Sequence, residues 1–165
     1  MKRLLEILRS AGEELTRAIE RVEQEYAVDV ESVEAQRMQQ VPGVGPVVAV
    51  TTIASLGDPG RFRDSRSAAC YTGLVPSENS SGERRRRGHI TKQGPSELRR
   101  VWIQAAQAAL HRRDFALRAW VNRLIYRRGR AVAVVALARR LFRWAFAVWR
   151  DGVDFDPQLA VRTAS

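Results

Sequence analysis

From Met1 to about Tyr26, apolar residues recur at alternating intervals of three and four. This spacing places them on one stripe of an α-helix, with Glu and Arg occupying most positions in between. Three heptads suffice for a coiled coil between copies of the chain, and they fit packing on the chain's own domain equally well. The stripe consists of Met1, Leu4, Leu8, Ala11, Leu15, Ala18 and Val22.

Shorter elements are predicted between residues 31 and 75. A second helix is expected over 31–40, because the residue before Pro42 disfavours helix. The apolar run 47–56 fits either a buried strand or a buried helix. Asp58 is expected to close a turn, and Asp64 to cap a short helix that ends at residue 71.

Residues 76–95 are the least regular segment and predict a loop or a short hairpin. The sequence after them is helical in composition almost to its end, and Ser96 is a candidate cap for the first of these helices. Predicted helices cover 96–112, 114–128 and 130–149, with stops at Gly129 and Gly152.

The pattern as a whole predicts a mainly α fold. A helical N-terminal segment (1–40) precedes one helical domain (41–156), and the tail (157–165) is expected to fray. The aromatic residues of the later helices are expected mostly in the core, since their spacing with alanine and valine fits helix packing. They are Trp102, Trp120, Tyr126, Phe142, Trp144, Phe146 and Trp149.

Charge is distributed unevenly along the chain. The formal net charge is +10; residues 1–40 carry a net −3, whereas residues 84–130 carry fourteen Lys and Arg against two acids, a net +12. Clustered arginine is the electrostatic footprint of a phosphate-rich partner. A membrane is the competing anion, but no apolar run reaches the ~18 residues of a spanning helix. The start, Met1-Lys2-Arg3, does not resemble a signal peptide, so a soluble, cytoplasmic protein is expected.

The cysteine and histidine content argues against two kinds of stabilising site. Cys70 is the single cysteine, so the chain has no internal disulfide. With only His89 and His111 beside it, a structural zinc site lacks ligands, and no metal site is predicted. Because Cys70 follows two alanines, it is expected to be a buried core thiol.

The segment Pro42-Gly43-Val44-Gly45 is a candidate phosphate contact. Gly43 and Gly45 allow a tight turn between helices, which leaves backbone N–H groups at the start of the next helix free to hold a phosphate. A helix-hairpin-helix holds a DNA backbone in this way. The alternative is a plain interhelical turn, and the sequence leaves both open.

The step Ser80-Ser81-Gly82 precedes Glu83 and the four arginines Arg84-Arg85-Arg86-Arg87. A serine becomes a nucleophile when a base removes its proton and a cation stabilises the charge that develops on the phosphate. The arginines supply the second requirement and not the first. Composition alone therefore favours a flexible linker with a solvated basic run. Lys92, Arg99 and Arg100 extend this basic surface.

An ordered set of motifs from Val41 to about Ala109 resembles a known family, the insertion-sequence transposases of the one-hundred-and-ten type, with their relatives the pilin-inversion recombinases. No single motif is specific, but their order and spacing are. The set comprises Val41-Pro42-Gly43-Val44-Gly45-Pro46, Leu56-Gly57-Asp58 with Arg61-Phe62, Ala69-Cys70-Tyr71-Thr72-Gly73-Leu74-Val75-Pro76-Ser77, Ser80-Ser81-Gly82, and Gly88-His89-Ile90-Thr91-Lys92-Gln93-Gly94 with Leu98-Arg99-Arg100.

The resemblance implies a function and a division of labour. Proteins of the family join a RuvC-like nuclease domain, whose four acidic residues bind divalent metal, through a coiled coil to a C-terminal domain like this one. The resemblance implies that Ser81, with Ser80 as second choice, attacks a DNA phosphodiester and forms a phosphoserine intermediate. It also implies a structured guide RNA as a partner in part of the family.

The nuclease domain and its Mg²⁺ are expected to be missing from this sequence, since Asp58, Asp64 and Asp114 do not replace its carboxylates. The chain alone is therefore expected to bind DNA or RNA without cutting it, with DNA transposition requiring the missing domain. The alternative is a non-enzymatic helix-hairpin-helix module that assembles into homo-oligomers through the N-terminal helix. A purely structural oligomerisation domain would leave the basic half of the chain unexplained.

Overall fold

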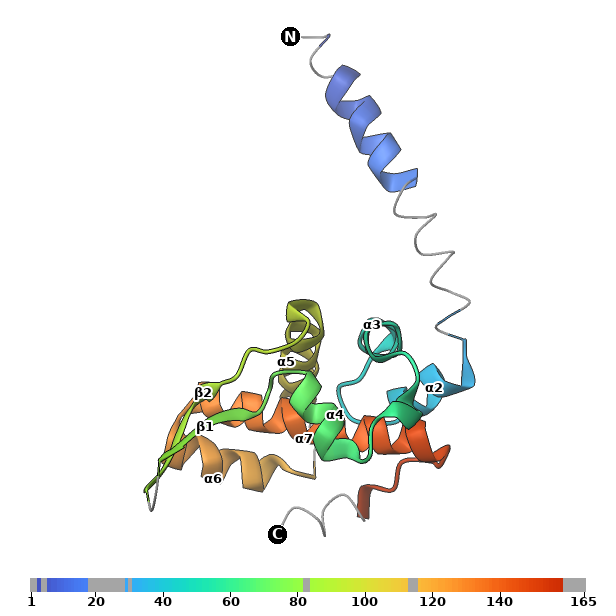
Figure 1. Ribbon diagram of the computed structural model, residues 1–165. Helices are drawn as coiled ribbons and strands as arrows, with labels where there is room; N and C mark the ends of the chain where they lie inside the picture. Colours follow the sequence, from blue (N-terminus) through green and yellow to red (C-terminus); the bar gives the residue numbers. More distant parts are fainter. Residues whose placement is uncertain are drawn as a thin grey trace.

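The computed structural model describes residues 3, 6–17, 29, 31–81, 84–112 and 116–158, with the backbone alone at 77–81 and 84–89. It confirms the mainly α fold (Figure 1). One two-stranded hairpin interrupts the helices. The elements are α2 (Val33–Gln39), α3 (Pro46–Leu56), the 3-10 turn η1 (Pro59–Arg61), α4 (Ser65–Tyr71), β1 (Pro76–Ser81), β2 (Arg84–Ile90), α5 (Ser96–His111), α6 (Arg118–Arg128) and α7 (Arg130–Asp151).

Helix α7 is the centre of the domain, and α2, α4, α5 and α6 all pack against it (Figure 1). Its apolar residues recur at the three- and four-residue spacing that gives a helix one buried face. Phe142 and Phe146 are fully buried there, and Trp102 of α5 meets the Phe142 ring edge-on at 5.3 Å. These aromatic residues confirm the predicted core positions, whereas Tyr126 on α6 is 93% exposed.

The apolar run 47–56 is a helix, α3, which settles the ambiguity that its composition leaves. Pro46 occupies the first helical position and Gly57 follows the last, a common arrangement of start and stop. The buried Thr52 hydroxyl donates to the Val48 carbonyl oxygen at 2.6 Å and accepts a hydrogen bond from Trp102 Nε1 at 3.0 Å. This bond joins α3 to α5 within the core.

The predicted turn at Asp58 and the predicted cap at Asp64 are confirmed, whereas the predicted cap at Ser96 is wrong. Asp64 accepts hydrogen bonds from the backbone N–H groups of Arg66 and Ser67 and caps α4, while Asp58 accepts from Gly60 N–H at 2.8 Å and closes its turn. Ser96 is the first residue of α5 and makes no capping bond, since Pro95 takes the cap position.

Cys70 is exposed, so the predicted core thiol is wrong. Helix α4 buries Ala68 and Ala69, and Thr72 is buried one turn further on. Cys70 lies between these buried positions, and the rotation of about 100° per residue places it on the solvent side of the helix. The two neighbouring alanines predicted that this segment is buried. They could not show on which side of the short helix Cys70 lies.

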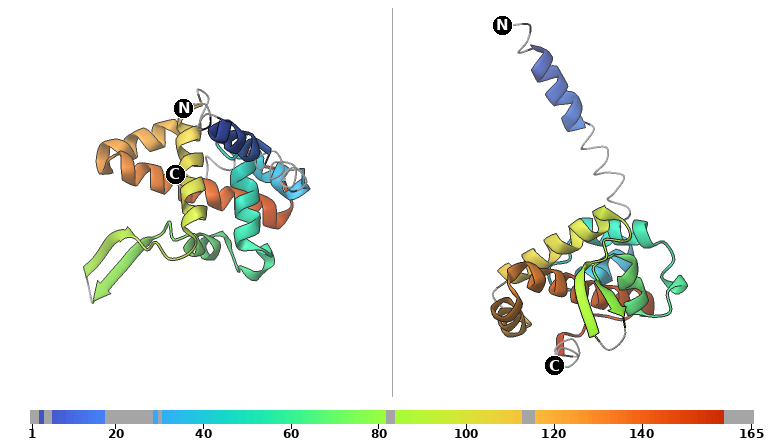
Figure 2. Two further views of the ribbon diagram at one scale, coloured as in Figure 1. Left: turned by 90° about the horizontal axis from the view of Figure 1, so that it is seen from above. Right: turned by 60° about the vertical axis from the view of Figure 1, so that its left-hand side comes forward.

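Strands β1 and β2 pair antiparallel as in a hairpin, one of the two structures predicted for 76–95. Its pairing runs from Pro76 opposite Ile90 at the base to Ser81 opposite Arg84 near the tip, with an irregularity between Pro76 and Glu78. The hairpin projects beyond the helices (Figure 1; Figure 2, left).

Residues 6–17 form the described part of the N-terminal helix, which stands away from the other helices (Figures 1 and 2). Leu8 and Leu15 of the apolar stripe are 60% and 63% exposed. These stripe positions therefore do not pack on the described part of the domain. Met1, Leu4, Ala18 and Val22, like the end of the tail, lie outside the described residues.

Candidate nucleic-acid interface

The base of the hairpin is fixed by two segments that pack backbone against backbone. Thr91 N–H donates to the Val75 carbonyl at 2.9 Å, and Lys92 N–H donates to the Gly73 carbonyl at 3.3 Å. Gly73 and Gly94 both have positive φ, and a Cβ on either would overlap a backbone carbonyl oxygen of the facing segment. These two motif glycines therefore have a structural role. They allow the two backbone segments to pack closely, and this packing sets the direction of the strands.

Lys92 has φ +53°, an uncommon conformation for a residue with a side chain. The hydrogen bond to Gly73 holds it there, directly after β2. From this position Lys92 lines a pocket of about 730 Å³ between the hairpin base, α4, α6 and α7. Lys92 is thus the predicted binding residue that the structure places in a concave site.

The pocket is lined by both basic and apolar residues. Its basic residues come from α4, the end of β2 and α7, and none of its lining residues is Asp or Glu. The basic residues are Arg66, Lys92, Arg139, Arg140 and Arg143; the apolar residues are Leu74, Pro76, Ile90, Trp120, Ala131, Val132, Val135 and Ala136.

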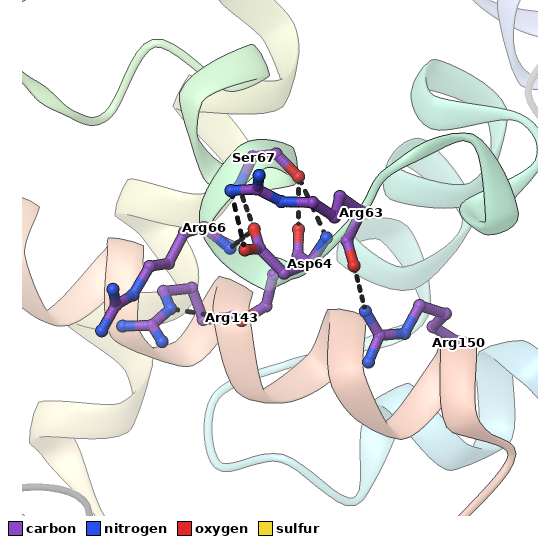
Figure 3. Close-up of polar contacts among 7 residues, drawn as sticks. Arg63, Asp64, Arg66, Ser67, Arg143 and Arg150 are labelled. Carbon is purple, nitrogen blue, oxygen red and sulfur yellow. Dashed lines mark hydrogen bonds and ion pairs between the residues drawn. The ribbon is translucent and has the colours of Figure 1, made fainter.

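Helices α4 and α7 are tied together beside this pocket (Figure 3). Arg143 Nε donates to the Ser65 hydroxyl at 3.3 Å, and Arg150 Nη1 donates to the Arg63 carbonyl at 3.3 Å. Backbone hydrogen bonding, led by that of Ser67, lowers the pKa of Asp64 below its ordinary value. The start of α4 is therefore anchored to α7 by arginine side chains.

The candidate nucleophiles lie at the far end of β1. Ser81 is paired in register with Arg84, and Ser80 with Arg85. Arg86 and Arg87 continue along β2 toward the base. The strand pairing thus places the Ser80-Ser81 step opposite arginines of β2. A loop would not hold the two segments in this register. The roles assigned to these residues stay predictions.

The structure gives two other predicted residues partners within the chain. Arg99 Nη1 donates to the Gly94 carbonyl at 2.7 Å, next to the hairpin base. Arg100 forms an ion pair with Glu97, with Nε 2.9 Å from the carboxylate oxygen, and this bond lowers the pKa of Glu97. Neither arginine lines the pocket with Lys92.

Gly43 and Gly45 lie in the turn between α2 and α3. Gly43 has φ +83°, and a Cβ there would overlap the carbonyl oxygen of Ala105 on α5. The turn is thus packed closely on α5 at this point, which accounts for Gly43 without a ligand. Gly45 is the extended N-cap of α3, with open space where a Cβ would lie. Phosphate contact at this turn stays a prediction.

The sequence reasoning missed four of the pocket's arginines. Arg139, Arg140 and Arg143 lie in the middle of α7, beyond the segment of highest charge, and Arg66 lies on α4. A signal was present, since three arginines at i, i+1 and i+4 lie on one side of a helix whose other side is apolar. Which elements face that side could not be read from the pattern.

Comparison with known proteins agrees with the motif set. Residues 35–122 match the model of the transposase IS116/IS110/IS902 family. The chain belongs to this family of insertion-sequence transposases. It is 35% identical over 151 residues to a probable family 20 transposase of Pseudomonas aeruginosa, covering 88% of this chain and 45% of the relative.

Two further transposases of the family give the same picture. The transposase for insertion sequence element IS1328 of Yersinia enterocolitica is 34% identical, covering 86% of this chain and 43% of the relative. The transposase for insertion sequence element IS1111A of Coxiella burnetii is 37% identical, covering 85% of this chain and 40% of the relative. The chain thus spans less than half the length of these relatives.

Two further findings concern the described part of the chain. It contains no helix long and apolar enough to cross a membrane. It also contains no group of three or more His, Cys, Asp or Glu residues that could hold a metal ion.

Proposed function

We propose that this chain is the DNA-binding part of a transposase and that Ser81 supplies the nucleophile for strand exchange. The observation that carries the proposal is the register of the hairpin, in which Ser81 is paired with Arg84 and Ser80 with Arg85. Directly opposed residues of an antiparallel pair have Cβ atoms about 4.5–5.5 Å apart. An arginine at that separation is in reach of a phosphate that the serine attacks.

The proposed step is a transesterification. The Ser81 oxygen bonds to the phosphorus, the bond from phosphorus to one DNA sugar oxygen breaks, and that oxygen takes up a proton. The serine proton passes to a base outside the hairpin. Arg84 to Arg87 stabilise the negative charge that builds up on the phosphate oxygens.

The base and the divalent metal, Mg²⁺, belong in this proposal to a RuvC-like nuclease domain. The described residues do not fit a metal site, since no three potential ligands are grouped among them. The proposal therefore assigns no step to a metal held by these residues. Lys92, Arg99 and Arg100 serve in it as contacts to the nucleic-acid backbone.

Two partners follow from the same proposal. A structured RNA is a second ligand for the basic surface, because RNA offers the same phosphates. A second copy of the chain would cover Leu8 and Leu15, which are exposed on the described part of the N-terminal helix.

The nucleophile is tested with Ser81→Ala and Ser80→Ala as a matched pair. Adjacent positions of a strand belong to opposite faces, so the two serines are not interchangeable. The assay combines this chain with a RuvC-like domain of the family and labelled DNA, and reads a covalent protein–DNA species on a denaturing gel. The species should disappear in Ser81→Ala and persist in Ser80→Ala. Recombination that survives removal of both serines would refute the assignment.

The second candidate is a non-enzymatic nucleic-acid-binding module. The turn that joins α2 to α3 favours it, because Gly45 is an open, extended N-cap as in a helix-hairpin-helix. This candidate predicts that the chain binds nucleic acid but forms no covalent protein–DNA species, with or without the serine substitutions. A coding frame immediately upstream that ends in a RuvC-like acidic domain would favour the transposase function instead.

A further inference from the structure

The pocket beside the hairpin base concentrates positive charge without a matching acid in its lining. Arg66, Lys92, Arg139, Arg140 and Arg143 all reach it, and no carboxylate lines it. Most ion pairs that the structure does form, such as those of Arg100 and Arg150, use an acid on the same helix. The pocket arginines are therefore set apart from the charge pairing seen elsewhere in the described residues.

Two of these arginines have an N–H donor without an acceptor among the described residues. Arg139 Nε and Arg140 Nη1 are buried, and neither has a hydrogen-bond partner in the described part of the chain. The Arg140 guanidinium lies over the Trp120 ring, 4.2 Å from its centroid, in a cation–π contact. Buried donors of this kind are normally satisfied, whereas the described residues offer these two no acceptor, and both arginines line the pocket.

The remaining pair of arginines comes from two helices. Figure 3 shows the Arg66 and Arg143 guanidinium groups side by side, on the side away from Arg150. Burial and then the neighbouring Arg66 and Arg139 lower the pKa of Arg143, and Asp64 offsets this only in part. The Asp64 carboxylate is already engaged as the cap of α4. Bringing an anion into the pocket would relieve this repulsion.

The rest of the lining limits what that anion can be. Trp120, Val132 and Val135 add apolar surface to the lining, although Arg140 covers one face of the Trp120 ring. An inorganic phosphate would satisfy the arginines and leave this apolar surface unused. A nucleotide unit carries both a charged phosphate and a flat apolar base, and about 730 Å³ falls within the roughly 300–1,000 Å³ usual for such ligands.

We propose that this pocket binds one phosphate of a single-stranded nucleic acid, with the attached nucleotide unstacked from its neighbours and in contact with the apolar part of the lining. The inference rests on the proposed function, in that the ligand is the nucleic acid bound by the hairpin, but it uses a different set of residues. Phosphate contacts and apolar contacts with a base tolerate any sequence, so the pocket positions a strand and does not read it.

The hairpin relates this pocket to the candidate nucleophile. Pro76 and Ile90 at the base line the pocket, and Ser81 lies five residues along β1. At about 3.4 Å per residue, Ser81 is roughly 17 Å from the base. A strand anchored in the pocket would therefore present to Ser81 a phosphate several nucleotides away, which makes the pocket a positioning site.

The test compares two double variants that remove the same charge. Arg139→Gln/Arg143→Gln removes two of the pocket's five positive charges, and Arg123→Gln/Arg127→Gln removes two exposed arginines of α6 that do not line it. Binding of the 165-residue chain to a labelled 12-nucleotide single strand, as DNA and as RNA, and to a duplex is measured across a salt series. Thermal melting checks the fold, with the single variant Arg139→Gln as the milder substitute if the double variant unfolds.

The pocket variant should bind the single strands at least about tenfold more weakly, with a salt slope lower by about 0.7 for each phosphate that it no longer neutralises. The α6 control should lose distinctly less affinity, and the duplex should be less affected than the single strands. The DNA and RNA arms show which strand the pocket prefers. Equal losses in both variants, or no loss in the pocket variant, would overturn the proposal.

The same experiment separates this inference from the proposed function. A chain in which Arg84 to Arg87 are alanine serves as the third arm. If that arm loses binding while the pocket variant does not, the pocket inference alone falls. If the wild-type chain binds no nucleic acid at low salt, the proposed function falls and the pocket inference with it.

Discussion

Replacing Gly43 with alanine should destabilise the domain more than the same change at Gly129. The two glycines have nearly equal positive φ angles, +83° and +84°, which a residue with a side chain rarely adopts. They differ in surroundings: a Cβ at Gly43 overlaps the Ala105 carbonyl of α5, whereas a Cβ at Gly129 has no atom within 4 Å. The pair thus compares a closely packed glycine with an open one at nearly the same φ.

The expected magnitudes follow from these two effects. Backbone strain of this kind costs about 1–3 kcal/mol at either position. At Gly43 the α2–α3 turn must also move away from α5, and overpacking of a core adds about 1–3 kcal/mol. Gly43→Ala is therefore expected to lower the free energy of unfolding by roughly 2–6 kcal/mol, against about 1–3 kcal/mol for Gly129→Ala.

Thermal and urea unfolding, followed by circular dichroism at the helical band, measure the difference. An excess of about 1–3 kcal/mol corresponds to a Tm lower by roughly 2–12 °C in a domain of this size. If Gly43→Ala is no less stable than Gly129→Ala, the turn is not packed on α5 as described. The structural account of Gly43 would then be refuted, and a ligand role for the turn would gain weight.

Three further predictions concern the core, a cap and the cysteine. Thr52→Val leaves the buried Trp102 N–H without an acceptor and should cost about 1–3 kcal/mol in urea unfolding, whereas Thr52→Ser keeps the hydroxyl and should cost less. Asp64→Ala should lower Tm at neutral pH; because hydrogen bonds lower the folded-state pKa of Asp64 below 3.8, its contribution is present above that pH and lost as pH falls through the folded value. The Tm gap to wild type should therefore close in acid, and a constant gap would show that the charge is irrelevant. Cys70 should react with a thiol reagent in the native protein as fast as in urea, and protection in the native state would contradict its exposure.

Much of the fold was accessible from the sequence because its helices carry regular apolar spacing and clear stops. Gly129 and Gly152 end helices as predicted, and Asp64 caps α4. The strand-or-helix ambiguity at 47–56 could not be settled locally, because a short apolar run has the same composition in either form. Tertiary packing of α3 between α2 and α5 decides it.

The candidate site was accessible only in part. The motif set identified the family and the Ser-Ser step, but the register that pairs Ser81 with Arg84 depends on long-range strand pairing. Arg66 and Arg143 are far apart in sequence and meet only because α4 packs on α7. Counting charges along the chain identifies charged segments of the sequence. It could not find a basic cluster that several helices and the hairpin bring together in space.

The central claim is that the hairpin arginines hold a nucleic-acid backbone. It is tested most directly by the affinity of the purified chain for labelled duplex DNA and structured RNA across a salt series, with and without alanine at Arg84 to Arg87. We expect tight, steeply salt-dependent binding by the wild type and a weaker affinity with a flatter slope in the variant. Binding that is absent at low salt, or unchanged in affinity and slope by the four substitutions, would contradict the claim.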